Sequence, residues 1–263
     1  MTTDNTPALL DFHRISVMRG ERLALDELTL KIQCGEHAAI LGPNGSGKST
    51  LIKTITRECY PLIREGSSMT ILGRSRWNVF ELRHVMGIVS NDLAASCSRD
   101  ITGLEAALSG FFSSIGICPQ HEVTAEMREK AADVLALLEI SHLADRYMNE
   151  MSSGEAHRVL IGRALVHDPR VLLLDEPSTS LDLFAQQELR SILRKLAASG
   201  LGILLVTHQL SDIIPEIERV ILMRNGRVFR DGGKAEYLAA PLLTELFGLP
   251  VDLTQRDGYY HAW

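Results

Sequence analysis

The chain has 263 residues, of which 45% are hydrophobic and 23% are charged, and its formal net charge is −6. This acidic balance gives no general affinity for nucleic acid or for an anionic membrane surface. No apolar run approaches the roughly 18 residues needed to cross a bilayer, and residues 1–12 lack the basic and apolar pattern of a secretion signal. The sequence therefore predicts a cytoplasmic protein made of one large or two small globular units.

The first third of the chain alternates short strands with short helices. Apolar and polar residues alternate over residues 9–33, which predicts an antiparallel strand pair with a turn near Gly20. The apolar run Ala38–Leu41 predicts a buried strand, and a glycine-rich loop and a helix over residues 48–58 follow it. Further elements are expected in this order: a strand at 69–72, a helix at 78–83 and a strand at 85–90.

The pattern changes after Asp92. Residues 100–167 contain no convincing strand but several helical patterns, such as 125–138, and we interpret this region as a helical insertion. The strand and helix alternation then resumes with a strand at 171–174, a helix at 182–198, a strand at 203–206, a hairpin around Asn225-Gly226, helical stretches to Leu246 and a last strand through Tyr259, Tyr260 and Trp263. The chain is therefore predicted to have an α/β fold.

The loop after strand 38–41 carries the most specific motif. Residues 42–50 read Gly-Pro-Asn-Gly-Ser-Gly-Lys-Ser-Thr, a complete phosphate-binding loop (Walker A) between a strand and a helix. Its glycines let backbone N–H groups converge, Lys48 can reach the β- and γ-phosphates, and the Ser49 hydroxyl can bind Mg²⁺. The predicted ATP-binding residues are Gly42, Pro43, Asn44, Gly45, Ser46, Gly47, Lys48, Ser49 and Thr50. The alternative is a glycine-rich turn that binds no nucleotide.

Two acidic residues end the apolar run Leu172-Leu173-Leu174. A buried strand beside the phosphate loop would place Asp175 at the Mg²⁺ ion. Glu176, one residue further on, would hold and polarise the attacking water. The alternative is a pair of solvated carboxylates at the end of a strand.

A shorter motif precedes these acids by 23 residues. Ser152-Ser153-Gly154-Glu155 has the S-x-x-E spacing of a capping box at the start of a helix. A capping box alone says nothing about function. Its position, however, is where ATP-binding-cassette (ABC) ATPases carry their Leu-Ser-Gly-Gly-Gln signature.

Together these motifs occur in a family order. With the run Ser180-Leu181-Asp182 and with His208, they make the chain resemble the ATP-binding subunits of ABC transporters, in detail those of bacterial metal-chelate and molybdate-type importers. The resemblance implies the ABC ATPase architecture: a phosphate-loop NTPase core with a RecA-like mixed sheet, an antiparallel β subdomain and a helical insertion. It implies one ABC domain over 9–247, with a catalytic core at 9–91 and 168–232, a helical subdomain at 92–167 and an extension at 233–263.

The resemblance also implies a mechanism. Two copies would pack head to tail around two Mg²⁺–ATP, with Ser152 to Glu155 of one copy facing the γ-phosphate on Lys48 and Ser49 of the other. Asp182 would link the two sites, and His208 would contact the γ-phosphate and orient the water against Glu176. The alternative for His208 is a core or capping histidine. The implied catalytic residues are Glu176, His208 and Lys48.

Three departures from the family pattern are visible. Asn91 stands where the family has glutamine, so it would reach Mg²⁺ through another water, and a purely structural role is equally open. Arg19 stands near the adenine-stacking aromatic position; it would stack its guanidinium on the base, or be a solvated turn residue. Ser153 and Glu155 replace glycine and glutamine in the signature.

The implied partners are ATP, a second copy of the chain and a separate transmembrane permease, with no nucleic acid. The protein would sit peripherally on the cytoplasmic face of the inner membrane and energise import of a metal chelate or an oxyanion. The region 92–120, with Phe111, Phe112 and Ile115, would dock the permease, unless these side chains are core. The alternative function is a soluble, non-transport ABC ATPase that acts on a ribosome or nucleic acid; the acidic charge and the lack of a basic arm argue against it.

Overall fold

A computed structural model describes residues 7–97 and 99–263, which form two compact units. The first contains the chain up to Val79 together with Gly202–Trp263, and the second is Phe80–Leu201. Residues 1–6, on which part of the argument against a secretion signal rests, lie outside the described residues. The limits expected for a catalytic core and a helical subdomain follow a different division and stay a prediction.

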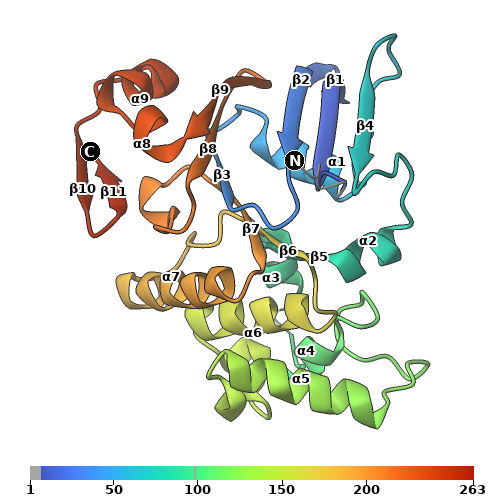
Figure 1. The fold of residues 1–263 in the computed structure, drawn as a ribbon. Coiled ribbons are helices and arrows are strands. Elements are labelled where there is room, and N and C mark those ends of the chain that lie inside the picture. The colour runs from blue at the N-terminus through green and yellow to red at the C-terminus, as the bar shows by residue number, and fades with distance from the viewer. Residues whose placement is uncertain (1–6, 98) are drawn as a thin grey trace, which may run out of the picture. The chain divides into compact units, whose positions relative to one another are not determined.

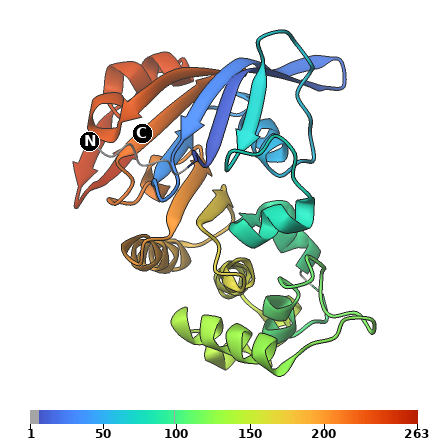
Figure 2. The same ribbon diagram turned by 45° about the vertical axis from the view of Figure 1, so that its right-hand side comes forward.

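The first unit begins with a three-stranded antiparallel sheet (Figures 1 and 2). Strand β1 (Leu10–Arg19) pairs on one side with β2 (Arg22–Ile32) and on the other with β4 (Ser68–Ile71). Gly20 occupies the turn between β1 and β2 with φ +60°. The predicted strand pair and its turn are therefore confirmed.

A second, mainly parallel group of strands forms the core of the same unit. Strand β3 (Ala38–Leu41) lies between β7 (Gly202–Thr207) and β8 (Arg219–Arg224), parallel to both. Every residue of β3 and β7 is buried, which explains why both read as unbroken apolar runs. Strand β9 (Arg227–Gly233) returns antiparallel to β8.

Two turns define the ends of these elements. Asn225 and Gly226 connect β8 to β9 with φ values of +51° and +75°, as the predicted two-residue hairpin requires. Helix α1 (Lys48–Ile55) is three residues shorter than expected. The chain leaves the helix at Thr56, and Arg57 adopts φ +65°, a conformation that a helix cannot continue.

The carboxy-terminal part of the first unit contains a hairpin where a single strand was expected. After α8 (Lys234–Tyr237) and α9 (Ala240–Phe247), strands β10 (Leu253–Arg256) and β11 (Tyr259–Ala262) pair antiparallel. Asp257 and Gly258 join them with φ values of +53° and +82°. Trp263 follows β11 and extends the pairing through backbone bonds with Asp252. The Asp-Gly pair is a hairpin signal that the sequence analysis did not use.

The second unit combines one parallel strand pair with helices (Figure 1). Strand β5 (Met86–Ser90) pairs with β6 (Val171–Asp175). The helices of this part of the chain are α2 (Val79–Val85), α3 (Asn91–Cys97), α4 (Gly103–Leu108), α5 (Ala125–Leu137), α6 (Ser153–Leu165) and α7 (Leu183–Ala198). Within the described part of 100–167 there is no strand beyond one isolated bridge, so the helical region is confirmed.

Helices α5 and α6 pack against each other at Gly162, where a small side chain would also fit. A Cβ atom on Gly162 of α6 would lie 3.4 to 3.6 Å from Leu138, Leu135 and Val134, which is ordinary packing distance. Leu135 and Val134 are buried on the inner face of α5, as its apolar periodicity predicted.

The start of α6 is fixed by a capping box. Ser152 Oγ accepts a hydrogen bond from the Glu155 backbone N–H at 3.3 Å, and Glu155 Oε2 accepts one from the Ser152 backbone N–H at 2.8 Å. Arg146 Nη1 lies 2.9 Å from the other carboxylate oxygen of Glu155. Two N–H groups that a helix start leaves unpaired are thus satisfied.

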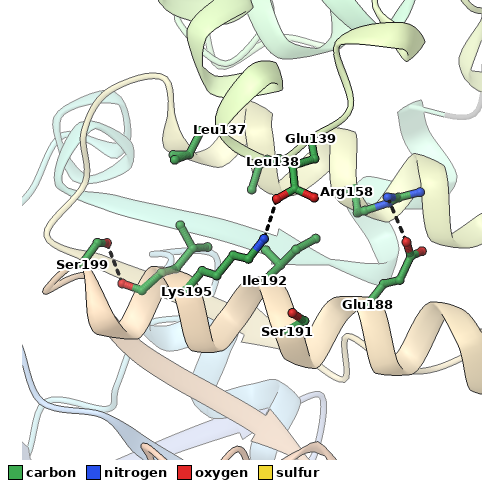
Figure 3. Close-up of a pocket in the computed structure, with 10 residues that line it drawn as sticks. Leu137, Leu138, Glu139, Arg158, Glu188, Ser191, Ile192, Lys195 and Ser199 are labelled. Atoms are coloured by element: carbon green, nitrogen blue, oxygen red, sulfur yellow. Dashed lines mark hydrogen bonds and ion pairs between the residues drawn. The ribbon is translucent and has the colours of Figure 1, made fainter.

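A surface hollow of about 190 Å³ lies between the end of α5 and the helices α6 and α7 (Figure 3). Its rim carries two ion pairs, Lys195 with Glu139 at 2.5 Å and Arg158 with Glu188 at 3.4 Å. Lys195 and Glu139 are largely exposed, so their pair contributes little to stability.

The buried His157 of α6 makes the stability of this fold sensitive to acid. Burial lowers the pKa of His157 to about 4, and its Nε2 has no hydrogen-bond partner in the described chain. The unfolded chain takes up the proton near pH 6.5 and the folded chain only near 4, so stability falls as the pH falls between these values.

We expect His157 to account for about 3 kcal/mol of this loss of stability. In urea unfolding at pH 7.5 and 4.5, the free energy of unfolding of His157→Leu should lack this contribution to the fall between the two pH values. His142→Leu, at an exposed site, is the control. If the free energy of unfolding of wild type and of His157→Leu fell equally between the two pH values, the assignment would be contradicted.

The capping box makes a second prediction. Glu155→Ala removes the bond to the Ser152 N–H and is expected to lower the free energy of unfolding by about 1 kcal/mol, whereas Glu155→Gln keeps an acceptor and should cost less. The hydrogen bond from the Ser152 N–H is the largest of the effects that hold the pKa of Glu155 below its usual value. The cost of Glu155→Ala should therefore be full at pH 7 and shrink as the pH falls below the ordinary glutamate range. Denaturant melts of the three proteins measure it, and an alanine variant as stable as wild type would count against the cap.

Candidate functional site

The phosphate loop follows β3 in the first unit and has room only for glycine at two positions. A Cβ on Gly42 would lie 2.4 Å from the Met223 carbonyl oxygen, and one on Gly47 would lie 2.8 Å from that of Ala24. Gly47 also has φ +106°, a region that other residues avoid. Both glycines are thus required by backbone packing as well as by the turn itself.

The loop is braced by the turn between β8 and β9. The Gly226 N–H donates to the Ser46 carbonyl at 2.9 Å, and the Gly226 carbonyl accepts from the Asp26 N–H at 3.0 Å. Arg227 adds an ion pair to Asp26 at 2.6 Å. The pair Asn225-Gly226 predicted the hairpin, but its contact with the phosphate loop is non-local, and no local signal marks that contact.

Lys48 lies over the loop that it follows. Its Nζ donates to the carbonyl oxygens of Gly42 at 2.7 Å and Pro43 at 3.3 Å, and the residue is only 5% exposed. The Ser46 hydroxyl is buried and has no hydrogen-bond partner among the described residues. The ammonium group of Lys48, the hydroxyl of Ser46 and the N-terminus of α1 together form a site that suits phosphate oxygens. The exposed Ser49 offers the oxygen donor that Mg²⁺ prefers.

His208 leaves the same sheet edge as the loop. Leu41 of β3 pairs with Thr207 of β7, so Gly42 and His208 follow neighbouring residues at the carboxyl ends of parallel strands. Ligands of open α/β sheets bind at such an edge. The structure therefore places His208 and the phosphate loop at the same sheet edge. Contact of His208 with a γ-phosphate stays a prediction.

The acids occupy the corresponding edge in the second unit. Asp175 ends β6 in register with Ser90 of β5, so Asn91, Asp175 and Glu176 come to one edge. Glu176 has φ +48°, which strains a residue other than glycine by about 1–2 kcal/mol. Asn91 opens helix α3 directly, where the sequence analysis expected the change of pattern only after Asp92. Because Asp175 and the phosphate loop belong to different units, a shared Mg²⁺ site is a proposal.

The signature-like residues lie where the starts of α6 and α7 meet. Ser153 Oγ donates to the Ser180 carbonyl at 3.1 Å, and a Cβ on Gly154 would lie 2.6 Å from that of Ala185. Asp182 Oδ1 accepts from the Ala185 N–H at 2.8 Å and caps α7. The structure therefore gives Gly154 and Asp182 packing and capping roles that sequence analysis missed; their roles across a dimer interface stay predictions.

Other predicted residues are less closely joined to these groups. Arg19 is exposed at the end of β1, with Nη1 3.8 Å from Cys59 Sγ, and stacking on a base stays a prediction. Phe112 stacks on His121 at 4.2 Å between ring centres, and Phe111 meets the edge of His167 at 5.1 Å. The two phenylalanines thus take part in packing within the second unit.

In residues 7–97 and 99–263, no helix combines the length and the apolar character needed to cross a bilayer.

Comparison with known proteins identifies the family. Residues 25–179 match the ABC transporter family. An uncharacterised ABC transporter ATP-binding protein of Bacillus subtilis, YlmA, is 32% identical over 92% of this chain and 92% of its own length. The hemin import ATP-binding protein HmuV of Aliivibrio fischeri is 29% identical over 90% of this chain and 89% of its own.

A solved structure of known identity has the same fold. It is a dimeric ATP-binding cassette in a post-hydrolysis state, bound to ADP and Pi, and is 27% identical with a TM-score of 0.69 over 85% of this chain and 98% of that one. The chain therefore has the α/β cassette fold that the motifs predicted. With its phosphate loop in place and its family matched over more than half its length, the chain belongs to the ABC transporter family as an ATP-binding protein and is an ATPase.

Proposed function

We propose that this chain is the ATP-hydrolysing subunit of an ABC importer, which dimerises around two Mg²⁺–ATP to drive a separate membrane permease. The observation that carries the proposal is the phosphate loop, with its buried Lys48 and the unused Ser46 hydroxyl beside the start of α1. The import role is supported by relatives such as the hemin import protein, which favours a metal chelate as the cargo, with an oxyanion as the alternative.

Each residue then has a defined task. Lys48 and the loop N–H groups bind the β- and γ-phosphates, while Ser49 and Asp175 would hold Mg²⁺ and Asn91 would reach it through water. The bound ion supplies neutralisation of charge on the phosphates. Glu176 accepts the proton of the attacking water, and His208 orients that water and contacts the γ-phosphate.

Exposed apolar side chains beside Asp182 are an argument for the proposed dimer. Leu183 and Phe184, the first residues of α7, are 82% and 70% exposed, although α7 buries other apolar side chains. They adjoin the contact of Ser153 with Ser180 and the exposed Ser152 at the start of α6. Apolar side chains beside a helix N-terminus suit a second copy that brings a phosphate to that N-terminus.

Location follows from the partner. A chain that drives a permease would lie in the cytoplasm, peripherally on the inner face of the membrane. The alternative, a non-transport ABC ATPase on a ribosome or nucleic acid, lacks a supporting basic surface in the composition, since the net charge is −6.

The role of Glu176 is tested by Glu176→Gln. The amide keeps the shape of the side chain but cannot accept the proton, so we expect ATP hydrolysis to fall at least about 100-fold while ATP binding persists. The variant should elute as a dimer in size-exclusion chromatography with Mg²⁺–ATP and as a monomer without it. Glu129→Gln, on the exposed face of α5, is the matched control. Normal hydrolysis by Glu176→Gln would refute the assigned base.

The transport role is tested by what accompanies the native protein. Membranes solubilised in mild detergent should yield this chain together with a multi-span permease, identified by mass spectrometry. Ribosomal proteins or nucleic acid in its place would overturn the import proposal and leave the ATPase assignment standing.

A further inference from the structure

The segment that follows His208 is closed on itself by a buried hydrogen bond. Thr207 Oγ1 donates to Asp212 Oδ2 at 2.6 Å, and the Gln209 N–H donates to Thr207 Oγ1 at 3.0 Å. Thr207 and Asp212 are 1% and 4% exposed. A buried bond to a carboxylate is strong, because the carboxylate would otherwise lose hydration without replacement. The ends of the turn that contains His208 are therefore tied together.

The carboxy-terminal hairpin braces the same segment from outside. Asp212 belongs to a short 3₁₀ helix, η3 (Leu210–Asp212), and β11 packs against η3. At the hairpin turn, a Cβ on Gly258 would lie 3.0 Å from Pro215 Cγ. In Figure 1 the hairpin is the red element labelled β10 and β11.

A third contact holds the far end of the segment. Lys234 Nζ donates to the carbonyl oxygens of Pro215 at 3.0 Å and Ile214 at 3.2 Å. The chain between β7 and β8 is thus fixed by a side-chain pair, by the hairpin and by a lysine.

His208 itself borders open space. It shares with Trp263, His261 and Phe247 a cavity of about 370 Å³ between the segment and the carboxy-terminal part of the chain. The contacts described above hold the segment through the residues on either side of the imidazole.

We propose that Thr207 and Asp212 are positioning residues for His208, with the carboxy-terminal hairpin bracing η3 behind them. The inference rests on the proposed role of His208 at the γ-phosphate. A loosened segment would present the imidazole in several positions, and only the fraction in the productive one would support hydrolysis. ATP binding, which the phosphate loop supplies, should be unaffected.

The test uses two substitutions at one position. Thr207→Val keeps the size of the side chain and its preference for a strand but removes the hydroxyl, whereas Thr207→Ser keeps the hydroxyl. We expect Thr207→Val to lower kcat for ATP about tenfold with KM and the Kd for ATP within about twofold of wild type. Thr207→Ser should restore kcat to within about twofold.

A double-substitution cycle separates positioning from general damage. In a His208→Ala background, Thr207→Val should cause no further fall in kcat, because the residue it positions is gone. A Thr207→Val protein with wild-type kcat, or one that lowers the activity of His208→Ala by the same tenfold, would overturn the inference alone. Absence of hydrolysis by the wild type would overturn the proposed function as well.

If Thr207→Val does not fold, the hairpin offers a second test. Gly258→Ala places a methyl group against Pro215, while Gly248→Ala, at a similar positive φ of +73°, meets nothing within 4 Å. Both variants carry backbone strain, so any common effect is loss of stability. We expect kcat to fall about threefold for Gly258→Ala only; equal kcat values for the two variants would overturn the inference.

Discussion

The backbone of the phosphate loop passes so close to its neighbours that side chains are excluded at Gly42 and Gly47. The neighbours are main-chain carbonyls of Met223 and Ala24, which cannot move aside as the tip of a flexible side chain could. The strands that carry these carbonyls, β8 and β2, therefore fix the path of the loop. The antiparallel sheet and the β8–β9 turn, distant from the loop in sequence, serve as its backing.

This backing means that contacts within the chain itself give the site its form. Lys48 Nζ takes the carbonyl oxygens of Gly42 and Pro43 as partners, so the ammonium is already held above the loop. A phosphate would replace hydrogen bonds to neutral carbonyls with stronger ones to a charged group, and little chain entropy would be lost in the exchange. Organisation before binding is what electrostatic stabilisation of a transferring phosphoryl group requires.

The sequence predicted those features that depend on neighbours along the chain. Buried strands such as β3 and β7 were visible as apolar runs, and the cap of α6 was visible as Ser152 and Glu155 three residues apart. Features set by contacts between distant segments were not. The end of α1 at Arg57 is an exception, because it is a local feature that the sequence did not predict. It depends on a positive φ, which an arginine in the sequence does not indicate.

The candidate site divides along the same line. Its chemistry was readable, because Lys48, Asp175 and Glu176 sit in motifs whose residue types follow from phosphate and metal binding. The contacts that hold the site in place could not be predicted in this way. The bond between Thr207 and Asp212, for example, can be predicted only when the conformation of the intervening turn is known. The carboxy-terminal hairpin had a local signal in Asp257-Gly258 that went unused, yet its contact with η3 had none.

Glu176 shows why the support matters. Its left-handed backbone conformation would be relaxed by glycine at this position, at the loss of the carboxylate. Residues held in such conformations persist where the surrounding structure determines them, and here β6 arrives from a fully buried run, Val171 to Leu174. The strained turn carries Glu176 out of the strand immediately after Asp175, and the proposal assigns a metal ion to the first of these carboxylates and a water to the second. A regular continuation of the strand would send the two side chains to opposite faces of the sheet. The left-handed turn at Glu176 removes that constraint, which the proposed division of roles requires.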